Sequence, residues 1–458
     1  MEFTLAQVEE ATGAQLSGSD SVPAASRELV STCVRGWSID SRTVQAGDLF
    51  IALRGERFDG HEYVWAALNG GAVGALIESS AGTVGGPVLH VTNTLEALGD
   101  LARYARRHWT KPIVAVTGSA GKTSTKEVIS ALLGTRFRVG KTVGNLNNHI
   151  GLPLTLLRIP YEAEVGVVEM GMNHAGEIRE LTNMARPQIG VVTNVGYAHI
   201  EAFESIEGIA AAKRELIEGL GPDGVAVLNA DDARVAAFCA AHRGRSLTYG
   251  LSASADVRAT EVESGPEGSK FTVDGVRFTT SLYGPHSISN ILAGIAVARL
   301  FELPLTDLVP AVRDLAPGKM RGERSELRGM TIWNDAYNSN PEAARSMVNL
   351  LKAERAERRI AVLGEMLELG TWAEKLHRDL GRYVVESGVD VLIGVRGASR
   401  WMVDEARRSG MNCSKALFFE QPEEAGDFLR EFSKPGDAIL FKGSRGTKVE
   451  RALARLDQ

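Results

Sequence analysis

The chain has 458 residues and a formal net charge of −6, and at roughly 150 residues per domain this length predicts about three domains. The 51 basic and 57 acidic residues nearly balance, which gives no electrostatic reason to expect nucleic acid or an acidic membrane as the main partner. Three cysteines far apart exclude a disulfide framework, and an acidic N-terminus without a long apolar run leads us to expect a cytoplasmic protein.

The predicted elements alternate between strands and helices over most of the chain. The first ~110 residues, with Gly- and Ser-rich turns at 18–26 and 81–87, predict a small α/β domain. Beyond them, short β-branched runs alternate with amphipathic stretches, which is typical of buried parallel strands joined by helices. The strands are expected at 113–116, 165–170, 189–195, 225–229, 360–364, 391–395 and 438–441, and the clearest helices at 124–133 and 341–357.

Two stretches interrupt this alternation. Residues 256–283 alternate polar and apolar side chains between Gly turns, which predicts an antiparallel flank. Residues 315–326 cluster Pro, Gly and charge and mark a domain break. The sequence therefore predicts an α/β protein of three domains: a small N-terminal α/β domain (1–110), a central P-loop ATPase-like parallel sheet with an antiparallel flank (111–317), and a C-terminal Rossmann-like domain (318–458).

A phosphate-binding loop follows the strand at 113–116. The loop and the helix start after it comprise Thr117, Gly118, Ser119, Ala120, Gly121, Lys122, Thr123 and Ser124. Glycines let backbone N–H groups approach phosphate oxygens, Lys122 suits the β- and γ-phosphates, and Thr123 suits Mg²⁺. Val116 stands where the general pattern has Gly or Ala, so the shorter GxxGKT form remains. We expect a bound nucleoside triphosphate.

Two side chains downstream of this loop suit the divalent cation of a triphosphate. Glu169 ends one predicted strand and His199 follows the next, and ligands bind at the carboxyl ends of strands in open α/β sheets. For each residue alone, a satisfied polar group in a loop is an equally good interpretation. Lys213 lies among alanines on a predicted helix, where a lysine is ordinarily a solvated surface residue.

At these residues the chain resembles the Mur ligase family, ATP-dependent amide-forming enzymes of peptidoglycan synthesis. TGSAGKTST, VVEMGM, NVGYAHIEAF and AAAKRELI look like four motifs of that family, and the resemblance spans residues ~35 to ~450. It implies that Thr123, Glu169 and His199 hold Mg²⁺, together with Lys213 if that lysine is carbamylated. It further implies catalytic roles for Lys122, Lys213, His199 and Arg321.

The resemblance also implies an ATP site that reaches into the C-terminal domain. Besides the loop residues from Gly118 to Ser124, it comprises Asn290, Arg321, Asp335, Tyr337 and Asn338. The family's His-Asn pair ahead of the asparagine is His286-Ser287 here. Without the resemblance, an interdomain salt bridge would explain Arg321, and capping of a helix approach would explain Asp335.

Four further segments resemble the family member that adds D-alanyl-D-alanine to the UDP-N-acetylmuramoyl tripeptide. They lie at 40–64, 144–157, 334–348 together with 363–370, and 441–450, and the DNPR segment of the diaminopimelate-adding member is absent. By this resemblance Ser41 and Arg42 hold the uridine diphosphate, and Lys442, Ser444 and Arg445 meet the dipeptide. Asn145, Asn147, Asn148 and His149 face the muramoyl peptide, with simple turn formation as the alternative.

The implied reaction passes through an acyl phosphate of the tripeptide and yields the UDP-MurNAc-pentapeptide, with ATP and Mg²⁺ as cofactors. The expected partners are small-molecule substrates, without nucleic acid or membrane insertion, and the expected state is a monomer. The alternatives are a sibling Mur ligase, a folylpolyglutamate-synthase-like amide ligase, and a P-loop ATPase switch that forms no bond.

Overall fold

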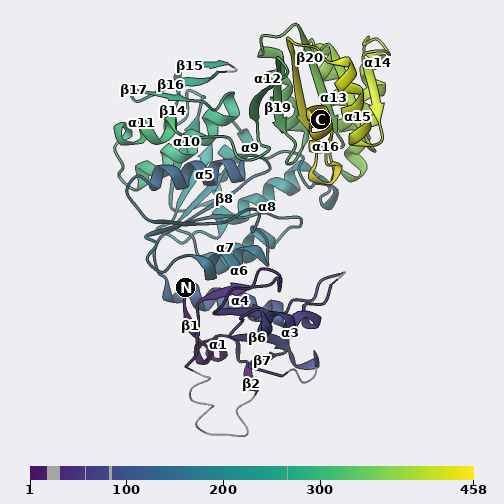
Figure 1. The fold of residues 1–458 in the computed structure, drawn as a ribbon. Coiled ribbons are helices and arrows are strands. Elements are labelled where there is room, and N and C mark those ends of the chain that lie inside the picture. Colours follow the sequence, from purple (N-terminus) through teal and green to yellow (C-terminus); the bar gives the residue numbers. More distant parts are fainter. Residues whose placement is uncertain (18–30, 57, 82–84, 266) are drawn as a thin grey trace.

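A computed structural model describes residues 1–17, 31–56, 58–81, 85–265 and 267–458. Sheets of five, seven and six strands form the N-terminal, central and C-terminal domains, and the N-terminal domain lies at the end opposite the C-terminal domain (Figure 1). The predicted three-domain α/β architecture is confirmed. The proposed boundaries at 110 and 317 fall between α4 (Thr94–His108) and β8 (Ile113–Thr117), and between α11 (Leu305–Arg313) and β18 (Glu323–Leu327).

The N-terminal domain carries a five-stranded sheet in the order β2-β7-β6-β5-β4, in which β2 is antiparallel and the other strands are parallel. Its elements are β1 (Phe3–Thr4), α1 (Leu5–Thr12), β2 (Gln15–Ser17), β3 (Cys33–Val34), β4 (Gly36–Ser38), β5 (Asp48–Ile51), α3 (Val64–Asn69), β6 (Gly74–Glu78), β7 (Val88–Val91) and α4. The predicted turn at 18–26 and part of the turn at 81–87 lie outside the described residues.

The central sheet is parallel and runs β14-β13-β12-β11-β8-β10-β9. Its strands are β8, β9 (Val139–Lys141), β10 (Val165–Glu169), β11 (Ile189–Val192), β12 (Val225–Asn229), β13 (Arg245–Gly250) and β14 (Val257–Arg258). Every residue of β8, β10 and β11 is buried, because helices cover both faces. Since β8 pairs with β10 on one side and β11 on the other, the chain leaves these three strands at one edge, where the predicted ligands lie.

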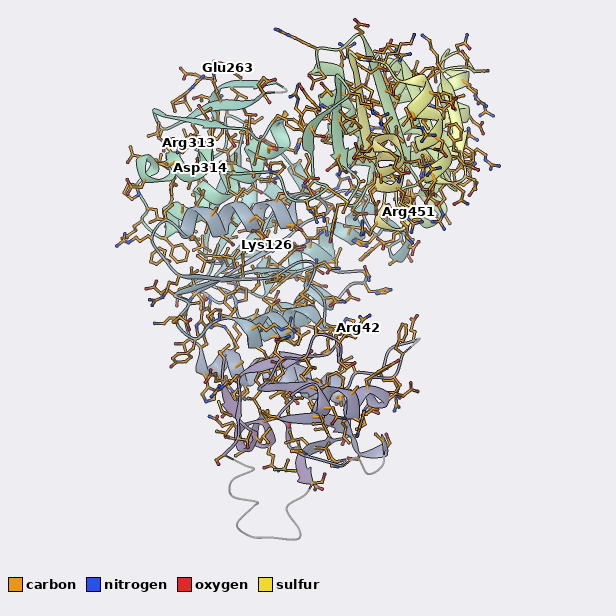
Figure 2. All side chains as sticks on the ribbon, viewed as in Figure 1. Arg42, Lys126, Glu263, Arg313, Asp314 and Arg451 are labelled. Atoms are coloured by element: carbon orange, nitrogen blue, oxygen red, sulfur yellow. The ribbon has the colours of Figure 1, made fainter. Side chains whose placement is uncertain are left out.

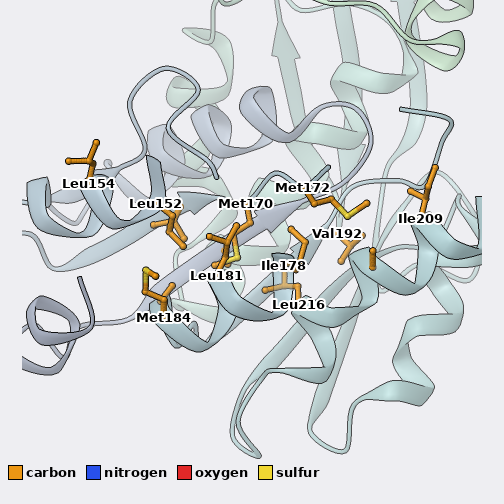
Figure 3. Close-up of a cluster of buried hydrophobic side chains, with 14 of the residues drawn as sticks. Leu152, Leu154, Met170, Met172, Ile178, Leu181, Met184, Val192, Ile209 and Leu216 are labelled. Atoms are coloured by element: carbon orange, nitrogen blue, oxygen red, sulfur yellow. The ribbon is translucent and has the colours of Figure 1, made fainter. Parts of the chain in front are cut away.

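The helices of this domain are α5 (Lys122–Leu133), α6 (Gly151–Arg158), α7 (Glu177–Ala185), α8 (Ile206–Glu218), α9 (Ala233–Ala236), α10 (Pro285–Leu300) and α11. Figure 3 shows part of the core beneath them, where Met170 at the end of β10 lies near Leu181 of α7 and Leu216 of α8. The same apolar cluster includes residues of α4, so the core is continuous from the N-terminal into the central domain. The same cluster also includes Trp333 and Met347 of the C-terminal domain, so all three domains share it.

The predicted antiparallel flank is present as β15 (Thr260–Gly265), β16 (Gly268–Val273) and β17 (Val276–Thr280). It begins later than expected, because Val257 and Arg258 of β14 pair parallel with β13 and belong to the main sheet. The two-residue β14 is too short for polar alternation to distinguish it from a hairpin strand.

The C-terminal sheet runs β18-β19-β23-β20-β21-β22, with only the β18–β19 pair antiparallel. Its elements are β18, β19 (Met330–Asp335), α12 (Pro341–Ala353), β20 (Arg358–Gly364), α13 (Ala373–Glu386), β21 (Val391–Val395), α14 (Ser399–Arg408), β22 (Ala416–Phe419), α15 (Pro422–Phe432), β23 (Asp437–Lys442) and α16 (Glu450–Asp457). Across the part of the chain that the structure describes, we find no helix with the length and apolar character needed to span a bilayer.

Candidate active site

The loop between β8 and α5 has the shape of a phosphate-binding loop. Gly118 (φ +149°) and Gly121 (φ +79°) adopt backbone angles that favour glycine, and a Cβ on Gly118 would overlap Thr193 Oγ1. Asn194 fastens the loop from the end of β11: its carbonyl accepts the Ser119 N–H (3.0 Å) and its Oδ1 accepts the Ala120 N–H (2.8 Å). The first N–H groups of α5, which have no intrahelical acceptor, remain to face an anion.

Lys122 begins α5 and donates to the Gly118 carbonyl at 2.9 Å. Burial lowers its pKa, the negative charges of Glu169 and Glu368 oppose that shift, and the positive charge of Arg321 adds to it. The structure therefore brings Lys122 within electrostatic reach of residues from three separate segments. One of them, Arg321, comes from the C-terminal side of the second predicted boundary.

Glu169 lies at the carboxyl end of β10 and is 2% exposed. Asn147 donates through Nδ2 to Glu169 Oε1 at 2.7 Å, and the backbone N–H of Glu169 donates to Thr142 Oγ1 at 3.0 Å. Its Oε2 is buried and has no hydrogen-bond partner among the described residues. A buried carboxylate oxygen without a partner is costly, and a bound cation would supply the missing interaction.

The asparagine-rich loop has members with different contacts. Asn147 contacts Glu169, whereas Asn148 Oδ1 accepts the N–H groups of Ile150 and Gly151 at the start of α6. Asn145, Asn148 and His149 are exposed. The Asn148 side chain thus fits the alternative of local turn formation. Contact of the loop with the muramoyl peptide remains a prediction.

His199 lies after β11 in a left-handed backbone conformation (φ +64°), which is uncommon for a residue other than glycine. Its Nδ1 lies 2.7 Å from Oε2 of Glu368, and this hydrogen bond holds the pKa of the Glu368 carboxyl below its usual value. Nε2 is therefore the ring nitrogen left for another ligand. Glu368 belongs to the C-terminal domain, so this pair links two domains.

Lys213 is not a surface residue, which corrects the reading from the residues alone. It lies on α8 and is 1% exposed, and its side-chain nitrogen makes no hydrogen bond or ion pair within the described ranges. Burial lowers its pKa well below the ordinary value, and the Lys122 charge acts in the same direction. An uncharged amine is the form that reacts with carbon dioxide to give a carbamate.

Asn290 on α10 lies against the phosphate loop. Its Oδ1 accepts the Thr125 hydroxyl at 3.0 Å, and a Cβ on Gly121 would lie 2.8 Å from the same oxygen. The predicted ATP residue is therefore beside the loop, although the intervening sequence is long.

The predicted C-terminal residues gather where β19 and β23 end. The guanidinium of Arg321 lies over the Tyr337 ring, 3.9 Å from its centroid. Lys442 is buried and donates to Asp335 and to the carbonyl of Asn338. Ser444 donates to the Ser339 carbonyl at 3.4 Å, and Arg445 pairs with Glu450 at 2.8 Å.

Ser41 and Arg42 stand apart from this cluster. Arg42 is exposed, pairs with Asp40 on its own loop at 2.7 Å, and lies on the side of the N-terminal domain that faces the central domain (Figure 2). The remaining predicted residues, Ser119, Ala120, Thr123 and Ser124, lie in the loop and at the start of α5.

Two acidic residues at this site were not predicted. Glu368 contacts His199, and Glu342 accepts the N–H of Tyr197 at 3.1 Å. Both belong to segments, LGEMLELG and NSNPEAAR, that the sequence had marked, but no local pattern distinguishes them from solvated glutamates. In the described part of the chain no three His, Cys, Asp or Glu side chains form a metal cluster, and the expected magnesium set contains only two such residues, Glu169 and His199.

Comparisons with known proteins identify the family of this chain. Family models for the Mur ligase family catalytic domain, the Mur ligase middle domain and the Mur ligase glutamate ligase domain match residues 34–106, 116–298 and 320–445. The UDP-N-acetylmuramoyl-tripeptide--D-alanyl-D-alanine ligase of Bacillus subtilis is 36% identical over 439 residues, 93% of each chain. The chain belongs to the Mur ligase family.

Other members of the Mur ligase family resemble the chain over its full length. The ligase of the same name from Escherichia coli is 34% identical and covers 100% of this chain and 99% of its own. A crystal structure of MurF from Acinetobacter baumannii has a TM-score of 0.89 at 29% identity, covering 100% of this chain and 99% of that one. MurF ligase from Thermotoga maritima, solved with ADP, has a TM-score of 0.82 at 29% identity, covering 93% and 97%.

Proposed function

We propose that this Mur ligase joins D-alanyl-D-alanine to the UDP-N-acetylmuramoyl tripeptide at the expense of ATP, giving the UDP-MurNAc-pentapeptide of peptidoglycan synthesis. The observation that carries the proposal is the convergence of Lys122, Glu169 and Arg321 at one phosphate loop, in a chain whose full-length relatives bear the name of this activity.

The chain's own residues support an acyl-phosphate route. The terminal carboxylate of the tripeptide attacks the γ-phosphate, while Lys122 and Arg321 offset the charge on the transferring group. The amine of D-alanyl-D-alanine then attacks the activated carbonyl, the tetrahedral intermediate collapses, and phosphate leaves. Because water would hydrolyse an acyl phosphate, the C-terminal domain closes the site with Arg321, Asp335, Tyr337 and Asn338.

The donor set fits Mg²⁺. Glu169 Oε2 is a buried oxygen without a partner among the described residues, Thr123 is the second residue of α5, and His199 keeps Nε2 available. With Lys213 as a carbamate, these residues would hold the cation, which supplies charge neutralisation on the phosphates. The carbamate is part of the proposal because burial lowers the pKa of Lys213 well below its ordinary value, which favours the uncharged amine.

The three domains then take separate tasks. Ser41 and Arg42 of the N-terminal domain hold the uridine diphosphate, since a guanidinium can donate two hydrogen bonds to a diphosphate. Asn145, Asn147, Asn148 and His149 face the muramoyl peptide. Lys442, Ser444 and Arg445 of the C-terminal domain meet the incoming dipeptide.

A sibling ligase and an ATPase switch are the competing functions. A diaminopimelate ligase and a folylpolyglutamate synthase share the fold at 19% and 17% identity, which speaks for the fold alone. A phosphate-release assay with the UDP-tripeptide and a panel of D-alanyl-D-alanine, diaminopimelate, lysine and glutamate separates them. We expect release only with ATP, the UDP-tripeptide and D-alanyl-D-alanine together.

Release without acceptor would indicate a switch, and turnover with another acceptor but not with the dipeptide would refute the proposal. Lys122→Ala should abolish release with the fold intact. The matched control is Lys270→Ala, which removes an exposed lysine on β16, far along the chain from the phosphate loop. The control should keep the wild-type rate.

A further inference from the structure

Segment 194–201 lies between the phosphate loop and the C-terminal domain. On one side, Ser119 Oγ accepts the Gly196 N–H (2.8 Å) and donates to the Gly196 carbonyl (3.0 Å). On the other side, Glu342 accepts the Tyr197 N–H and the Glu368 carbonyl accepts the Glu201 N–H. The segment is thus held by two domains at once.

Glu342 makes an unusually close contact with this segment. It occupies the first turn of α12, whose N-cap is Asn340, and its Oε1 lies 3.1 Å from the Tyr197 nitrogen. A Cβ built on Gly196 would lie 2.6 Å from the Glu342 carboxyl carbon. Only a glycine at 196 lets the carboxyl group sit directly on the 196–197 peptide.

Burial of the Glu342 carboxyl group carries a cost in folding free energy. Glu342 Oε2 is buried with no hydrogen-bond partner in the described part of the chain. Burial raises the pKa of Glu342, the nearby charge of Asp232 adds to the rise, and the Tyr197 N–H and the charge of Arg345 oppose it. An unpaired carboxylate oxygen in an interior position is destabilising in itself.

We propose that Glu342 is a positioning residue for ATP: from the C-terminal domain it holds the Gly196–Tyr197 peptide, and through that peptide it sets the orientation of Ser119 in the phosphate loop. Docking of the C-terminal domain and the shape of the nucleotide site are then coupled by one carboxyl group. This inference rests on the proposed function for its catalytic meaning, but the coupling itself concerns nucleotide binding alone.

The test compares three variants by ADP affinity, measured calorimetrically with Mg²⁺, and by the KM for ATP. Glu342→Gln keeps an acceptor oxygen and should bind ADP like the wild type. Glu342→Ala removes the acceptor, and loss of one hydrogen bond should weaken ADP binding by about tenfold. Glu386→Gln, which changes an exposed carboxylate on α13, is the control and should change nothing.

A double-mutant cycle with Gly196→Ala tests the contact directly. Gly196→Ala should weaken ADP binding because its Cβ meets the Glu342 carboxyl group, whereas Gly196→Ala combined with Glu342→Ala should be no worse than Glu342→Ala alone. Wild-type ADP affinity in Glu342→Ala, or strictly additive losses in the cycle, would overturn the proposal.

A merely structural role would lower the unfolding midpoint in Glu342→Ala and leave the KM for ATP and the ADP affinity unchanged. That result would also overturn the proposal. Because ADP binding needs neither the UDP-peptide nor an acceptor, the outcome is independent of whether the proposed ligase reaction is correct.

Discussion

His377 is a fully buried histidine on α13, and both of its ring nitrogens are engaged. Nε2 accepts the Met366 N–H at 3.0 Å, which requires an unprotonated Nε2, and Nδ1 donates to the Ala373 carbonyl at 2.7 Å. The hydrogen bond to Met366 thereby holds in place the segment that includes Glu368, the partner of His199. Burial lowers the pKa of His377 to about 4.

This shift predicts a pH dependence of stability. The unfolded chain takes up a proton on His377 near its ordinary pKa of about 6.5, whereas the folded chain does so only near 4. Stability contributed by the neutral ring is therefore complete above about pH 6.5 and is lost as the pH falls toward 4, by up to about 3 kcal/mol. In His377→Gln, the fall of the free energy of unfolding between pH 7 and 4.5, measured by urea titration, should be smaller.

His174→Gln, which removes an exposed imidazole, is the matched control for this measurement and should keep the wild-type slope. If His377→Gln and the wild type lose stability in parallel, the buried ring does not contribute to acid sensitivity. Such a result would also weaken the assignment of His377 as the support of the Glu368 segment.

Among the elements, the turn from β8 into α5 depends most on residue identity. Gly121 combines a left-handed backbone (φ +79°) with a Cβ direction that points at Asn290 Oδ1, 2.8 Å away. Gly121→Ala should cost about 1 to 2 kcal/mol of folding free energy from the backbone alone. It should also weaken ADP binding, because Asn290 and Thr125 must shift.

Thermal unfolding and ADP calorimetry check this prediction. The control is Gly221→Ala in the turn after α8, because a Cβ there meets no atom within 4 Å and its φ is not in the left-handed range. Equal effects of the two substitutions would show that the geometry of the phosphate loop does not decide nucleotide binding.

The elements also show what the sequence could and could not predict. The seven predicted parallel strands are present, because β-branched runs such as IVAV are stable in a sheet covered on both faces. The parallel strands β9, β13, β19 and β22 were not predicted. The phosphate loop was predictable because its GxxGKT residues are contiguous in the sequence and lie between a strand and a helix. In contrast, Lys213 was read as a surface residue, because a lysine among alanines has the same pattern on either face of a helix.

The roles of Glu342 and Glu368 could not be predicted from sequence patterns for a different reason. Their partners, Tyr197 and His199, lie more than a hundred residues earlier in the chain and in another domain. No periodicity within a helix or loop encodes such a contact. The site residues from Ser41 to Arg445 remain predictions, to be tested by the binding and turnover experiments above.

At the scale of the whole molecule, polar and aromatic groups of the C-terminal domain contact the central domain beside the nucleotide site. Besides the two glutamates, Tyr197 and Trp372 have ring centroids 5.9 Å apart, and Tyr283 and Trp333 are 4.4 Å apart. One apolar cluster includes residues of all three domains, among them Trp333 and Met347 of the C-terminal domain. Because the proposed acyl phosphate must be shielded from water, the C-terminal domain is the part that we expect to move as a body.

We expect ligands to favour the docked arrangement, because Arg321 of the C-terminal domain lies within electrostatic reach of Lys122 in this structure. Two cations repel, and phosphate between them removes that repulsion. Small-angle scattering should show a smaller radius of gyration with Mg²⁺, a nonhydrolysable ATP analogue and the UDP-tripeptide than without them. Lys122→Ala, which loses one of the two cations, should show a weaker response. Superimposable curves with and without ligands would mean that closure is not ligand-driven, and that the domains reach this arrangement before the substrates arrive.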